Sequence, residues 1–230
     1  MGNFHDVYLF EPENFMNAIM PYMEALRKVK NGYSLVRTAA IDLYDRNPQV
    51  RFLAEEYGGW DRNAIITQIP SSYPQSPDNI AFWFVILLYG YCRMKEPSTL
   101  GLGNHWRLVD SILKMLDWSD ADRNLLIEGK RFTELVQKTF LENKKNGEIN
   151  IMGYWDYVNP FSQDGHVGWI SFQESQILLE RMINDKDRLT GIAKIMKTDF
   201  ELLQRVYQAA SEMLIAAKEA HCGLCIIRSG

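Results

Sequence analysis

The chain has 230 residues, 47% of them hydrophobic and 23% charged, which is ordinary for a folded globular protein and argues against a disordered chain. Its formal net charge of −4 argues against a nucleic-acid-binding protein, because such proteins usually present a basic face. The length suits one domain over residues 1–230, and three cysteines are too few for a disulfide framework. The first residues lack the basic start and apolar stretch of a signal peptide, so we expect a cytoplasmic protein.

The N-terminal part of the chain predicts a strand followed by helices. Residues 6–10 are rich in β-forming side chains and predict a strand. Apolar residues at steps of three and four predict an amphipathic helix over 13–31, and Pro21 should kink it or begin a second helix. Two further helices are expected, over 34–44 and 48–58.

A loop rich in proline and serine at 69–78 is the only position at which we expect a possible internal boundary. Soon after it, residues 80–92 read IAFWFVILLYGYC and contain no charge. A helix that crosses a bilayer needs about 20 apolar residues, so this run is too short to span a membrane. It predicts a core helix that other parts of the protein surround.

The second half of the chain continues with helices, one irregular region and a closing strand. Asn104 is well placed to cap a helix whose apolar stripe runs to Leu116. Ser171 and Glu174 form a capping box for a helix to about Asn184. The remaining elements expected are helices at 119–127, 133–142 and 199–220, an irregular region at 146–170, and a strand over 223–228.

These elements predict an α+β fold that is predominantly α-helical, a multi-helix domain with a small sheet. Strands occur at both ends of the chain and helices lie between them. We therefore expect the N- and C-terminal strands to pair, which would tie both chain ends into the fold.

Four segments occur in a recognisable order: MGN…VYLFEPENFMNAI at the start, NHWRLVDSIL at 104–113, GWISFQESQILLERM at 168–182 and the tail VYQAASEMLIAAKEAHCGLCIIRSG. Taken together they resemble the YfbM-like family, small bacterial proteins of unknown function. Residues 34–100 have no counterpart in that family. The resemblance implies a bacterial protein with an α+β fold, and it implies no established active site.

His221, Cys222 and Cys225 form the only metal-like spacing in the sequence. Cys-x-x-Cys supplies half of the ligands of a structural zinc site, and His5 would approach if the terminal strands pair. Residues three apart on an extended chain point to opposite faces, however. The alternative is that the two cysteines are small apolar residues that pack beneath the last helix.

Gly101 and Gly103 precede a predicted helix start. Glycines in this position can leave backbone N–H groups available to an anion, and Arg107 would assist. The segment lacks the third glycine of a dinucleotide site and the Gly-Lys-Ser/Thr of a phosphate loop. The alternative is a capped helix start at which His105 or Trp106 closes the core.

His166 lies close to Asp164 in the irregular region, and an Asp–His pair can orient a general base. Catalysis would also need a nucleophile, and no nucleophile-elbow motif occurs in the sequence. With His105, Arg107 and Asp110, His166 would form a pocket for a small molecule or a reaction. The alternative is a histidine on a surface loop.

Aromatic residues in the irregular region carry our leading functional prediction. Trp155, Tyr157 and Trp169 would form a contact patch, because aromatic residues are enriched at binding hot spots. The same residues would equally seal irregular loops of a helical domain. We expect a non-enzymatic protein that binds another protein, of an accessory or immunity type; a small-molecule binder or enzyme with the His/Arg/Asp pocket is the alternative. No cofactor, nucleic-acid or membrane partner is expected, and the oligomeric state stays open.

Overall fold

A computed structural model describes residues 4–28, 32–58, 61–67, 83, 86–93, 100–131 and 165–229. The chain divides into two compact units. Unit 1 contains residues 1–11, 93–130 and 164–230, and unit 2 contains residues 12–92 and 131–163. The boundary loop expected at 69–78 and the helix expected at 133–142 lie outside the described residues.

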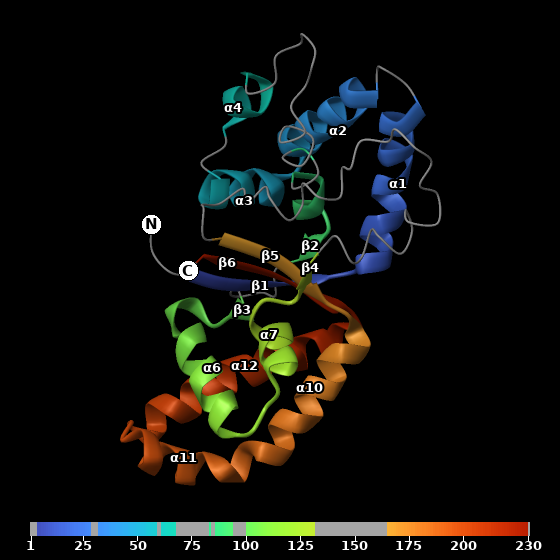
Figure 1. The fold of residues 1–230 in the computed structure, drawn as a ribbon. Coiled ribbons are helices and arrows are strands. Elements are labelled where there is room, and N and C mark those ends of the chain that lie inside the picture. The colour runs from blue at the N-terminus through green and yellow to red at the C-terminus, as the bar shows by residue number, and fades with distance from the viewer. Residues whose placement is uncertain are drawn as a thin grey trace. The chain divides into compact units, whose positions relative to one another are not determined.

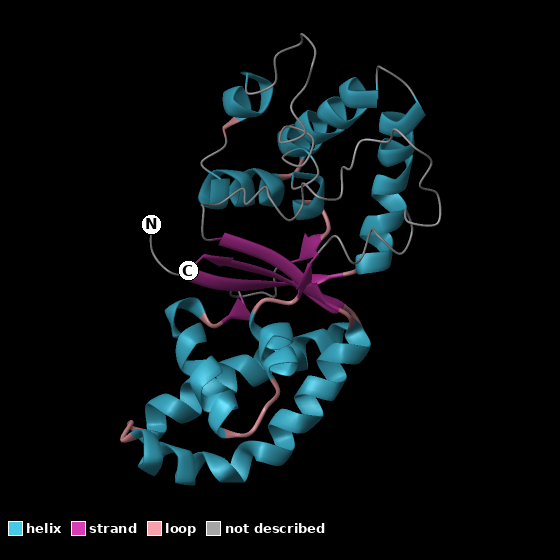
Figure 2. Ribbon diagram, viewed as in Figure 1, coloured by secondary structure: helices cyan, strands magenta, loops and turns pink. Residues whose placement is uncertain are grey.

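The sheet of unit 1 is built around the last strand of the chain. β6 (Gly223–Ser229) pairs antiparallel with both β1 (Phe4–Phe10) and β5 (Gly165–Ile170), as Figures 1 and 2 show. The expected pairing of the terminal strands is confirmed. Three two-residue strands complete the sheet, whose order is β2-β1-β6-β5-β4 with β3 also paired to β1: β2 (Cys92–Arg93), β3 (Leu100–Gly101) and β4 (Lys130–Arg131).

The helices of unit 1 bury one face of the sheet in a common apolar core (Figure 1). The sheet contributes alternate residues such as Val7, Leu9 and Ile226 to this core, and their intervening neighbours Tyr8 and Ile227 are buried as well. The core helices are α6 (Trp106–Met115), α7 (Asp120–Ile127), α10 (Phe172–Asp185), α11 (Leu189–Met196) and α12 (Phe200–Ala220).

Two of these helices begin as their sequences predict. Ser119 caps α7 by accepting a hydrogen bond from the backbone N–H of Asp122. Ser171 and Glu174 form the reciprocal capping box at the start of α10. Such caps satisfy backbone donors that have no partner within the helix, so the local sequence is sufficient to mark these starts.

The described residues of unit 2 are mainly helical, and strand residues occur there only at Cys92 of β2 and Arg131 of β4. Its helices are α1 (Pro12–Lys28), α2 (Gly32–Arg46), α3 (Pro48–Gly58) and α4 (Arg62–Thr67). α1 continues through Pro21, so no second helix starts there. The apolar run is helical at Trp83 and at 86–89, with these side chains buried, as expected of a core helix.

Three expectations from the sequence are wrong in detail. The helix of the apolar run ends in a turn at Gly90-Tyr91, and Cys92 begins β2. Asn104 caps no helix, because it lies within a 3₁₀ turn (Gly103–His105) that precedes α6. The end of the region expected to be irregular is strand β5, whose pairing with β6 is a long-range contact that local patterns cannot reveal.

The fold is therefore α+β and predominantly helical, with a small antiparallel sheet that contains both terminal strands. Within the part of the chain that the structure describes, no helix combines the length and the apolar character needed to cross a bilayer.

Candidate functional site

The residues of the predicted metal site do not come together. Cys222 and Cys225 are buried, whereas His221 is exposed and its ring stacks on Phe172 with centroids 5.8 Å apart. Both ring nitrogens of His5 are already hydrogen-bonded elsewhere. Among the described residues, no group of three or more His, Cys, Asp or Glu side chains is placed to hold a metal ion.

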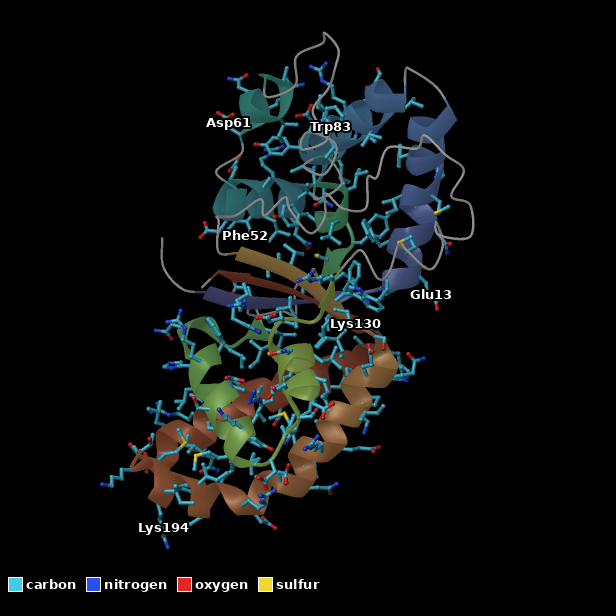
Figure 3. All side chains as sticks on the ribbon, in the orientation of Figure 1. Glu13, Phe52, Asp61, Trp83, Lys130 and Lys194 are labelled. Atoms are coloured by element: carbon cyan, nitrogen blue, oxygen red, sulfur yellow. The ribbon has the colours of Figure 1, made fainter. Side chains whose placement is uncertain are left out.

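Of the three residues of the predicted aromatic patch, the structure describes only Trp169. Trp155 and Tyr157 lie outside the described residues. Trp169 is 8% exposed, and the Nζ atom of Lys130 lies 3.7 Å from its ring centroid (Figure 3 labels Lys130). Lys130 also pairs with Glu174 at 2.8 Å, so its ammonium group is held over the ring.

A different group of side chains meets where α6 begins and β6 ends. The guanidinium carbon of Arg228 lies 4.4 Å from the ring centroid of Trp106, and that of Arg107 lies 4.9 Å from it. Arg228 also donates to Glu128 at 2.7 Å. An aromatic ring attracts cations through its negative face, so Trp106 holds two guanidinium groups close together.

A second arm of this group lies between α6 and α7. Asp110 stands one helical turn beyond Trp106, and its carboxylate lies 3.5 Å from Nε of Arg123. Arg123 is only 9% exposed and donates through Nη2 to Asp120 at 2.7 Å. We call the six side chains Trp106, Arg107, Asp110, Arg123, Glu128 and Arg228 the arginine–tryptophan cluster.

His5 lies behind this cluster as a fully buried, neutral imidazole. It is opposite Arg228 in the β1–β6 register. Its Nε2 lies 2.9 Å from the carbonyl oxygen of Ile127, and its Nδ1 lies 3.3 Å from the backbone N of Leu102. A carbonyl oxygen can only accept and a backbone N–H can only donate, so the proton sits on Nε2. Burial, with a smaller contribution from the nearby Arg228, lowers the pKa of His5 to about 4.

The cluster contains buried donors that lack acceptors. Nε1 of Trp106, Nε of Arg228 and Nη1 of Arg123 are buried and have no hydrogen-bond partner among the described residues, and Nε of Arg123 has only the Asp110 carboxylate at 3.5 Å. Each unsatisfied buried donor costs about 1–3 kcal/mol, and more when it carries charge. Buried N–H donors without a protein partner are usually satisfied by an acceptor such as a bound oxyanion or a water molecule.

Gly101, which precedes α6, has a structural role that differs from the anion binding predicted for it. A Cβ atom at Gly101 would lie 2.2 Å from the carbonyl oxygen of His5, so glycine permits the close approach of β3 to β1. The N–H of Leu102 is already bonded to that same carbonyl at 3.0 Å. The donors available to an anion here are therefore side chains of the cluster.

The structure brings together part of the predicted His/Arg/Asp pocket. Arg107 and Asp110 belong to the cluster, and His105 is exposed at the residue before α6. His166 lies opposite Arg228 in the β5–β6 register, and its side chain is outside the described residues.

Arg123, Glu128 and Arg228 were not among the site residues predicted from the sequence. The single available signal was an arginine at the end of an otherwise apolar terminal strand, since a charge there needs a partner.

No protein-family model, curated protein or solved structure matches the chain. The resemblance to the YfbM-like family stays an expectation from the sequence.

Proposed function

We propose that this protein binds a small molecule through an oxyanion, a phosphate or carboxylate group, held by the arginine–tryptophan cluster. The observation that carries the proposal is the set of buried N–H donors on Trp106, Arg123 and Arg228 that have no acceptor among the described residues. An oxyanion supplies several acceptor oxygens at once, and guanidinium groups match its geometry.

The charges and exposure of the cluster support this ligand class. Arg107 is exposed, and its guanidinium forms no ion pair within the described part of the chain. It can therefore turn toward an arriving anion while its side chain stays over Trp106. The neutral His5 adds no positive charge of its own, and Arg123 and Arg228 are already paired with carboxylates. Recognition therefore rests on the charge of Arg107, supported by the remaining N–H donors of the cluster.

The test is titration of the purified protein with inorganic phosphate, and separately with citrate, by isothermal calorimetry at low ionic strength. Arg107→Gln should weaken binding about tenfold or more, because a hydrogen bond to a charged group contributes about 1.5–3 kcal/mol. Trp106→Phe keeps an aromatic face but removes the Nε1 donor, and it should weaken binding less. Arg205→Gln, an exposed arginine on α12, is the matched control and should bind as the wild type does.

Stronger binding of phosphate would assign a phosphorylated ligand, and stronger binding of citrate a carboxylate. If neither anion binds, or if Arg107→Gln and Arg205→Gln bind equally well, the proposal is wrong. The protein-binding function predicted from the sequence is then the hypothesis to test. It would be tested by affinity purification of the tagged wild type from its native host, with mass spectrometry of the proteins that co-purify.

A further inference from the structure

Unit 2 contains an open pocket that has no part in the proposed oxyanion site. Its volume is about 440 Å³. It lies between the end of α2, one face of α3 and the start of α4, where Figure 3 labels Asp61. Its lining is almost entirely charged or polar: Tyr44, Asp45, Arg51, Glu55, Asp61, Arg62 and Asn63.

Two interactions hold the walls of this pocket. Asp45 and Arg62 form a forked ion pair, with Nε–Oδ1 at 2.8 Å and Nη2–Oδ2 at 3.0 Å, which joins α2 to α4. The hydrogen bond from Arg62 holds the pKa of Asp45 below its usual range. Tyr44 donates its hydroxyl proton to Glu55 at 2.7 Å, which joins α2 to α3. Burial and Glu55 raise the pKa of Tyr44 to about 12, so the hydroxyl stays protonated.

Within these walls, Arg51 and Glu55 form no ion pair with another described residue. Arg51 donates to the backbone oxygen of Asp45 at 3.0 Å, and its guanidinium carbon lies 5.6 Å from the ring centroid of Tyr44. From the described residues, Glu55 accepts a single side-chain hydrogen bond, from the hydroxyl of Tyr44. Arg51 and Glu55 are one turn apart on α3, which places their Cβ atoms about 5–6 Å from each other.

We propose that this pocket binds a free amino acid, with the ligand carboxylate on Arg51 and the ligand ammonium on Glu55. An amino acid carries both charges two bonds apart, so it can bridge two groups on neighbouring turns of one helix. Arg51 offers a planar set of donors to a carboxylate, and a carboxylate side chain accepts from an ammonium group. The Tyr44 hydroxyl keeps Glu55 in place, and the Asp45–Arg62 pair keeps Arg62 from competing for the ligand carboxylate.

The test uses calorimetric titration of the full chain with each of the twenty L-amino acids, and then with the N-acetyl and amide derivatives of the best ligand. In the wild type, both derivatives should bind at least tenfold more weakly than the parent. Arg51→Gln should abolish the preference for the amino acid over its amide. Glu55→Gln should abolish the preference over the N-acetyl form. Arg46→Gln and Glu56→Gln, exposed residues outside the pocket lining, are the matched controls and should keep both preferences.

Three results would each overturn the proposal. They are no binding of any amino acid at millimolar concentration, equal binding of the parent and both derivatives, and unchanged preferences in both variants. If one variant fails to fold by circular dichroism, the comparison of derivatives on the wild type still decides. Because the pocket lies in unit 2 and the cluster in unit 1, failure of one proposal leaves the other untouched.

Discussion

At the scale of single residues, His5 shows how burial determines a charge. The ring is 0% exposed and both of its nitrogens are hydrogen-bonded, and acceptance of the Leu102 N–H at Nδ1 requires the neutral form. Protonation would place a cation beside Arg228 and remove one of the two acceptors of the Leu102 N–H, the other being the His5 carbonyl oxygen. The neutral ring therefore joins β1 to the end of α7 at a residue that the sequence marked only as a distant metal-ligand candidate.

The lowered pKa of His5 predicts a loss of stability in acid. The unfolded chain takes up a proton near pH 6.5, whereas the folded protein takes it up near pH 4. The contribution of His5 is thus fully present above pH 6.5 and is lost as the pH falls from 6.5 to 4. The total loss is about 3 kcal/mol, at about 1.4 kcal/mol for each pKa unit.

Two measurements check this prediction. The imidazole resonances of His5 should not titrate above about pH 5 in NMR spectra, since the folded pKa is about 4. The free energy of unfolding of His5→Gln should fall less steeply with acid than that of the wild type between pH 6.5 and 4. His105→Gln, at an exposed position, should follow the wild type. A His5 resonance that titrates near pH 6.5 would contradict the prediction.

At the scale of elements, two glycines have opposite roles in helices. Gly129 follows α7 with φ of 71°, and a Cβ atom there would lie 2.6 Å from the backbone N of Trp169. It ends the helix with hydrogen bonds to the carbonyls of Asn124 and Leu125. Gly191 lies within α11, where an added Cβ atom would meet nothing within 4 Å.

Substitution by alanine should therefore change stability in opposite directions at these two positions. Gly129→Ala forces a side chain into the left-handed region and against strand β5, so it should destabilise unit 1 by about 1–3 kcal/mol. Gly191→Ala should stabilise α11 by about 0.5–1 kcal/mol, because alanine loses less entropy in a helix. Urea unfolding of both variants measures the change in the free energy of unfolding and therefore its sign at each position. The same sign in both would show that local backbone conformation does not govern these positions.

At the scale of the whole molecule, the end of the chain forms the centre of the sheet. β6 pairs with a strand at the start of the chain and with a strand that precedes α10. Its Ile226 is 0% exposed and belongs to the core cluster of unit 1 together with residues of α6, α10 and α12. Stability of this core therefore depends on the last residues that the structure describes.

Removal of side-chain volume at Ile226 should lower the stability of the whole of unit 1. Ile226→Ala should lower the free energy of unfolding by about 2–5 kcal/mol, the range for a large core side chain reduced to alanine. Ile195→Ala, at a side chain that is 71% exposed, should change it by less than about 0.5 kcal/mol. Chemical denaturation followed by near-ultraviolet circular dichroism compares the two. Equal effects would mean that β6 does not complete the core.

The sequence by itself determined the local elements of this protein. Both serine caps, the terminal strands and the helices of the N-terminal part follow from spacing and capping within a few residues. Two predictions from the sequence were wrong for physical reasons: one element depends on a long-range strand pairing, and one glycine has a role in strand packing that local spacing does not indicate. β5 exists because it pairs with β6, and Gly101 allows the close approach of β3 to β1.

Only the tertiary structure decided which side chains meet. Arg107 and Asp110 were selected from the sequence because they lie near a helix start. Their partners Arg123 and Arg228 are brought to them by helix packing and by the pairing of distant strands. In the same way, the Asp45–Arg62 pair joins α2 to α4 beside a pocket that is also lined by α3. Hydrophobic periodicity is set by neighbours along the chain, whereas a binding site depends on contacts between residues far apart in it, which no local pattern encodes.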